Sequence, residues 1–137
     1  MSLLDTGMRE LGLVQGQDHL LDVRWAGSDA SRFSPLAAEL LASHPSAVVV
    51  STNLAAIAVQ NLSPTVAIVG TGLNAPVETG LVASLARPGG NITGVATMAD
   101  DVLIKLFEFM RELLPQERRI AVMKNPTNRP TRSCLIG

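Results

Sequence analysis

Apolar positions along this chain switch repeatedly between two spacings. Helical spacing predicts helices over residues 4–11, from 34, from 53 to about 61, over 77–85, and between Asp100 and Pro115. Alternating or wholly apolar, β-branched runs predict strands over 19–25, 47–50, 65–69, 92–96 and 120–123. Because strands alternate with helices, we expect an α/β protein. The predicted fold is a Rossmann-like three-layer parallel sheet with helices on both faces.

Capping and turn residues refine these boundaries. Ser34 is predicted to be the N-cap of its helix, with Pro35 as the first helical residue. Residues 70–76 are predicted to form a loop between a strand and the helix over 77–85. The strands over 47–50 and 65–69 carry apolar residues at successive positions, which is typical of strands buried on both faces.

Composition limits the classes of protein. The 137 residues suit a single domain, and 47% of them are hydrophobic, so a sizeable core is possible. With one Trp, three Phe and no Tyr, that core must be aliphatic. A net charge of −1 gives no basic surface for nucleic acid. A single cysteine excludes an internal disulfide and a cysteine zinc cluster. No apolar run approaches the ~20 residues of a membrane span, and no signal-peptide pattern is present.

Three segments could bind a ligand, because ligands of such sheets lie at the carboxyl ends of the strands. Ser51, Thr52 and Asn53 offer hydroxyls, an amide and backbone N–H groups that suit a carboxylate. Capping of a helix, which needs only one of the three, is the preferred interpretation. Residues 125–128, beginning with Asn125, could bind ligand, and a plain turn is preferred.

The remaining segment, Gly70–Ala75, fits the dinucleotide pattern G-x-G-x-x-A and contains Asn74 and Ala75. A nucleotide-binding Rossmann-type enzyme fragment is therefore the alternative function. No acidic residue ends the next strand to hold a ribose, so a binding or connecting loop is preferred.

Catalytic constellations are missing from the sequence. Neither His19 nor His44 lies at a predicted strand carboxyl end, and Ser51 has no nucleophile-elbow motif around it. Cys134 lies in a tail without a clear pattern. We therefore predict a protein that is not an enzyme, with no catalytic residue, metal or cofactor.

Several stretches, in this order, resemble one family. They are Gly7–Gln17, Val23–Ala26, Leu36–Leu40, Gly80–Gly94 (GLVASLARPGGNITG) and Glu112–Pro115. The chain is similar to ABC-transporter substrate-binding proteins of the tryptophan-binding type, which have a type I periplasmic-binding fold. The similarity extends to about Asn128, and Gly80–Gly94 is its most specific part.

The resemblance implies a two-lobed periplasmic or extracytoplasmic protein that captures a small solute, such as an amino acid, between its lobes and delivers it to an ABC permease. Family ligand contacts carry over to Ser51 and Thr52, to the loop before Pro76, and to Asn125 in the second lobe. The family usually has Asp before that Pro. Here Ala75 stands instead, so no carboxylate is offered to a ligand ammonium group.

By the same resemblance, the chain is expected to be cut short at both ends. Residues 1–98 would form the first lobe without its first strand, and residues 99–137 the start of the second lobe with an atypical tail from 129. The missing strand lies mid-sheet in the family, so its loss would leave backbone groups unpaired. We hypothesise that Arg119–Lys124 fills this gap, within the chain or swapped between copies in a homodimer.

Overall fold

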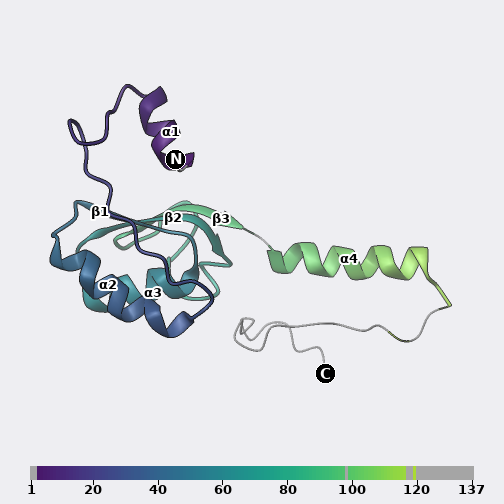
Figure 1. The fold of residues 1–137 in the computed structure, drawn as a ribbon. Helices are drawn as coiled ribbons and strands as arrows, with labels where there is room; N and C mark the ends of the chain where they lie inside the picture. The colour runs from purple at the N-terminus through teal and green to yellow at the C-terminus, as the bar shows by residue number, and fades with distance from the viewer. Residues whose placement is uncertain (1–2, 98, 117–118, 120–137) are drawn as a thin grey trace.

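The computed structural model describes residues 3–97, 99–116 and 119. Along the chain lie α1 (Leu3–Glu10), the 3₁₀ helix η1 (Ala30–Arg32), α2 (Phe33–Ala42), β1 (Ala47–Val50), α3 (Asn53–Leu62), β2 (Ala67–Asn74), β3 (Ile92–Thr97) and α4 (Ala99–Leu113). The strands form one sheet of three parallel strands in the order β1-β2-β3. Helices α2 and α3 lie beneath one face of it (Figure 1). The predicted α/β class is confirmed.

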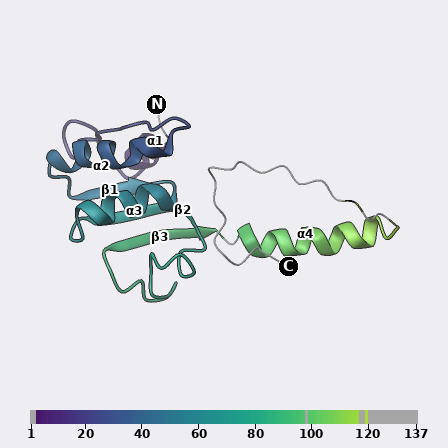
Figure 2. The same cartoon turned by 90° about the horizontal axis from the view of Figure 1, so that it is seen from below.

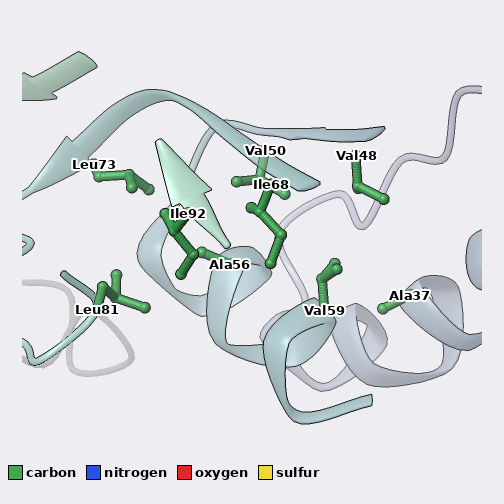
Figure 3. Packing of buried hydrophobic residues seen from close by; sticks show 9 residues of the cluster. All are labelled: Ala37, Val48, Val50, Ala56, Val59, Ile68, Leu73, Leu81 and Ile92. Carbon is green, nitrogen blue, oxygen red and sulfur yellow. The ribbon is translucent and has the colours of Figure 1, made fainter. Parts of the chain in front are cut away.

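The core lies between this face of the sheet and the two helices (Figure 3). Its buried side chains are all aliphatic, as composition predicts: Ala37, Val48, Val50, Ala56, Val59, Ile68, Leu73, Leu81 and Ile92. Ala56 on α3 and Ile68 on β2 are completely buried. Burial of a side chain such as Ile68 contributes about 1.5–3 kcal/mol, so α3 and β2 form the centre of the fold.

Several sequence-based predictions agree with these elements. The helices over 4–11, 53–61 and 100–114 and the strands over 47–50 and 92–96 are present within a few residues. The predicted strand over 120–123, with Arg119–Lys124 as a gap-filling segment, lies outside the described residues apart from Arg119.

The predicted strand over 19–25 is wrong. This segment has no ladder partner in the described structure, beyond a single bridge between Gln15 and His19. Leu20 and Trp25 are 90% and 79% exposed. Alternation of apolar residues makes a segment suited to a sheet, but a strand exists only where a neighbouring backbone completes its hydrogen bonds. Among the described residues β1 pairs with β2 alone, so the other edge of β1 has no strand beside it.

The prediction of strands buried on both faces is also wrong for β1. Its burial alternates, with Val48 and Val50 buried and Val49 47% exposed. The reason is that α2 and α3 pack against one face only, so successive side chains of a strand point into the core and away from it.

The segment after β2 differs most from expectation. The strand continues through Asn74 instead of ending at Val69, because a bulge between Gly70 and Leu73 lets β3 pair with Leu73 and Asn74 as well. The predicted helix over 77–85 is absent. A turn forms instead, with bonds from the Thr79 N–H to the Ala75 carbonyl and from the Leu81 N–H to the Pro76 carbonyl. Gly80, at φ 73°, then turns the backbone left-handed and ends it.

The start of α2 is displaced from the predicted Ser34 cap. The helix begins at Phe33, directly after η1, and Ser34 is already helical. The N-cap of α2 is Arg32, which makes no side-chain capping bond. Asp29 caps η1 instead, where its carboxylate accepts hydrogen bonds from the Ser31 N–H at 2.9 Å and the Ser31 hydroxyl at 2.7 Å. These bonds hold the pKa of Asp29 below its usual value. The predicted Ser34 cap is therefore wrong, because η1 leads directly into α2 and the side-chain cap lies at the start of η1.

Gly94 on β3 lies directly opposite Gly70 on β2, and the two backbones approach each other closely there. A Cβ at Gly94 would overlap the Gly70 backbone, and its φ of 139° is itself unfavourable for other residues. We predict that Gly94→Ala lowers the free energy of unfolding by about 2–4 kcal/mol. Urea denaturation measures it. Gly90→Ala, where a Cβ meets no atom within 4 Å, is the control and should change stability little. Equal stability of the two variants would contradict the prediction.

Candidate ligand-binding site

The carboxyl ends of β1 and β2 lie side by side and run into polar segments. Ser51 and Thr52 follow β1, Asn53 begins α3, and Asn74 ends β2. Because parallel strands have their carboxyl ends at one edge of the sheet, these residues were predicted to come together. A pair of hydrogen bonds between Asn53 and Asn74 shows that they do.

Asn53 acts as a clamp between α3 and β2. Its Nδ2 donates to the Asn74 carbonyl at 2.7 Å, and its Oδ1 accepts from the Asn74 N–H at 3.0 Å. The side-chain amide thus takes the place of a peptide group on a neighbouring strand. Nδ2 also lies 3.5 Å from the Thr79 hydroxyl. The amide of Asn53 is therefore occupied by the protein itself, which favours a positioning role over ligand contact.

Thr52 caps α3, as the preferred sequence interpretation held. Its backbone is extended, its Oγ1 accepts from the Ala55 N–H at 3.2 Å, and its carbonyl accepts from the Ala56 N–H at 3.1 Å. The hydroxyl of Thr52 still has its own hydrogen to donate. Ser51 is exposed, and its hydroxyl forms no hydrogen bond with the described part of the chain. Both side chains therefore present hydroxyl donors beside the positive end of the α3 dipole.

Ala75 has a left-handed backbone, with φ 42°. Asn and Asp populate this region more readily than Ala does. The Thr79 hydroxyl lies 3.1 Å from the Ala75 carbonyl and 3.2 Å from the Pro76 carbonyl, and it can donate to either. The side-chain Oδ1 of Asn74 is buried with no hydrogen-bond partner in the described structure.

Two residues that stabilise this edge were not predicted from the sequence. The Thr71 hydroxyl donates to the Val50 carbonyl at 3.3 Å and so ties β2 to the end of β1, while Thr79 closes the turn after Ala75. No sequence signal marked Thr79, because the residues around it predicted a helix. Thr71 lay inside a motif that was interpreted as a loop. Of the predicted ligand residues, Asn125 lies outside the described part of the chain.

The dinucleotide motif does not have the geometry its chemistry needs. Pyrophosphate binding requires a glycine-rich turn that opens a helix, so that backbone N–H groups point at the phosphates. Here the residues from Gly70 to Asn74 belong to β2, and turns follow them instead of a helix. Within the described residues, no group of three or more His, Cys, Asp or Glu could hold a metal ion. The side chains at this edge, from Ser, Thr and Asn, are uncharged hydrogen-bonding groups.

A shallow hollow of about 60 Å³ lies along β3 and the segment after β2, lined largely by apolar side chains such as Val82, Leu85 and Ile92. Ligand pockets commonly enclose about 300–1,000 Å³, so this hollow is too small for one. It includes none of the predicted ligand residues. No helix in the described ranges has the length and apolar character needed to cross a membrane.

Comparison with known proteins agrees with this architecture. Residues 2–135 match the family described as ABC transporter substrate binding protein. A tyrosine-binding protein of Clostridioides difficile is 26% identical over 118 residues, which cover 86% of this chain and 34% of that protein.

Two solved structures share the fold. A conserved domain protein from Vibrio cholerae matches with a TM-score of 0.69 and 25% identity, over 82% of this chain and 38% of that one. An ABC domain from Streptococcus pneumonia, in complex with L-Trp, matches with a TM-score of 0.61 and 25% identity, over 66% of this chain and 30% of that one.

The fold is that of a periplasmic-binding-type α/β domain, and the family match spans almost all of the sequence. The chain belongs to the ABC transporter substrate-binding protein family. This match confirms the family to which the sequence resemblance pointed. The chain spans about a third of the length of the relatives it matches.

The Asn53 clamp can be tested through stability. We predict that Asn53→Ala lowers the free energy of unfolding by about 1–3 kcal/mol, since it leaves the N–H and carbonyl of Asn74 without partners. Asn61→Ala is the matched control, because Asn61 is exposed on the same helix. It should be neutral or slightly stabilising by helix propensity. Urea denaturation compares both with the wild type, and a neutral Asn53→Ala would show that the clamp contributes nothing.

Proposed function

We propose that this chain is the solute-binding component of an ABC-type import system and forms one wall of a cleft for an amino acid with an aromatic side chain. The family match over residues 2–135 is the observation that carries the proposal. The relative named as tyrosine-binding and the neighbour bound to L-Trp support this class of solute. In this role the chain binds its solute without transforming it.

The proposed division of the chain follows the family's two lobes. Residues 1–98 supply the first lobe and residues 99–137 begin the second, which would bring Asn125 to the opposite wall of the cleft. Good sites bury about 70–90% of a ligand, and a single wall buries less. We therefore expect weak binding by this chain alone. Delivery to a permease would take place outside the cytoplasm, where the family acts.

The edge formed by Ser51 and Thr52 suits the carboxylate of an amino acid. Hydroxyl donors lie beside the amino end of α3, where the helix dipole and unpaired backbone N–H groups favour an anion. Asn53 contributes by holding the end of β2 against the start of α3. Asn53 was predicted to contact the ligand. In this proposal it positions the backbone of β2 instead.

Titration with L-tryptophan, followed by backbone amide NMR shifts, tests the function. We expect shifts concentrated at residues 51–54 and 71–75 at concentrations up to about 10 mM, since a Kd of about 1 mM corresponds to about −4 kcal/mol. Shifts elsewhere, or a response to NADH and none to L-tryptophan, would contradict the proposal. Ser51→Ala should weaken binding by about 2- to 12-fold, the value of one hydrogen bond, without changing stability. Ser43→Ala, at the end of α2, is the control and should bind normally.

Ala75→Asp tests the place of the ligand's ammonium group. Asp accepts a left-handed backbone better than Ala, so the substitution should be tolerated at φ 42°. The new carboxylate should raise affinity for L-tryptophan by several-fold. Affinity for indole-3-propionate, which has no ammonium group, should stay level or fall. Equal gains for both compounds would place the ammonium group elsewhere.

A further inference from the structure

The Thr79 side chain lies where three segments meet at the edge of the sheet. These are the start of α3, which lies below the sheet in Figure 2, the end of β2, and the turn that follows Ala75. The Thr79 hydroxyl lies 3.5 Å from Asn53 Nδ2, 3.1 Å from the Ala75 carbonyl oxygen and 3.2 Å from the Pro76 carbonyl oxygen. One partly buried hydroxyl therefore contacts both the Asn53 clamp and the turn beyond it.

The hydrogen bonds of this hydroxyl run in series from α3 to the turn. Asn53 Nδ2 carries two hydrogens, and one of them bonds the Asn74 carbonyl at 2.7 Å. The other is available to Thr79 Oγ1, and Thr79 donates its own hydrogen to the Ala75 carbonyl, the nearer of its two acceptors. Hydrogen bonds in series polarise and strengthen one another. The first residue of α3 is thereby linked, through Thr79, to the backbone of Ala75.

The backbone of Ala75 needs this support. A left-handed φ of 42° is unfavourable for Ala and persists only where the surrounding structure holds it. The Ala75 N–H donates to the Thr97 carbonyl at 3.2 Å, and the Ala75 carbonyl accepts from the Thr79 N–H at 3.0 Å as well as from the hydroxyl. The hydroxyl is the one side-chain group among these partners, so a substitution can remove it and leave the backbone bonds in place.

The support bears on binding because Ala75 directly follows β2, at the edge where the solute is proposed to lie. Groups at a binding site must be held close to their productive positions by the residues behind them. We propose that Thr79 is a positioning residue for solute binding. Its hydroxyl holds the turn at Ala75 against Asn53 without contacting the solute. This inference rests on the proposed function and adds to it the residue that fixes the shape of the edge.

Titration of Thr79 variants with L-tryptophan tests the role of the hydroxyl. Thr79→Val keeps the β-branched shape and should weaken binding by about 2- to 12-fold, the value of one hydrogen bond. Thr79→Ser keeps the hydroxyl and should bind within about 2-fold of the wild type. Thr93→Val is the matched control, because Thr93 is exposed on β3 and its hydroxyl forms no hydrogen bond with the described part of the chain. It should bind normally.

The side-chain amide of Asn53 reports on the hydrogen bond in the absence of any solute. In Thr79→Val, the NMR resonance of one Asn53 amide hydrogen should move upfield, while the other stays in place on the Asn74 carbonyl. Thr79→Ser should leave both resonances near their wild-type positions. Unchanged resonances in Thr79→Val overturn the link between Asn53 and the turn.

Rescue at position 75 separates positioning from a general loss of structure. Asn adopts a left-handed backbone more readily than Ala, so Ala75→Asn should restore affinity to Thr79→Val by several-fold and raise that of the wild type by less. Equal gains in the two backgrounds, or equal affinities of Thr79→Val and Thr79→Ser, overturn this inference alone. A wild type that does not respond to L-tryptophan overturns the proposed function and this inference with it.

Discussion

The fold depends on β2, the one strand in the described structure with a neighbour on both sides. It pairs with β1 from Ala47 to Val50 and with β3 from Ile92 onward, and its Ile68 lies fully buried against α3. Each buried backbone group of such a strand must find a partner, so the position of β2 determines where its neighbours lie. At the close approach of Gly70 and Gly94, a Cβ on Gly94 would overlap the Gly70 backbone.

The candidate site is a consequence of the same strand. Since β1 and β2 run parallel, their carboxyl ends share one edge, and the amide of Asn53 joins the start of α3 to the end of β2. Rigid positioning of this edge leaves Ser51 and Thr52 as the hydroxyls that point outward. A binding protein needs this division of labour, in which some polar groups hold the backbone and others meet the solute.

The regions away from β2 have fewer tertiary contacts. In the described structure, the segment over residues 19–25 lacks a ladder partner and the far face of the sheet leaves Val49 half exposed. Helix α4 carries exposed apolar side chains such as Leu106 and Phe109. In each of these regions, apolar side chains or backbone hydrogen-bonding groups lie without a packed neighbour. Surfaces of this kind are where a protein is able to associate with further elements or molecules.

The sequence by itself determined the α/β class, the aliphatic core, the family, and the places of α1, α3, α4, β1 and β3, because periodicity and capping act locally. It also grouped Ser51, Thr52, Asn53 and Asn74 at one edge of the sheet. Tertiary structure alone decided that residues 19–25 form no strand, that β2 extends to Asn74, and that a turn replaces the helix over 77–85. These outcomes depend on which distant backbone offers hydrogen bonds, and local patterns carry no information about that. For the same reason only the fold revealed that Asn53 is a clamp.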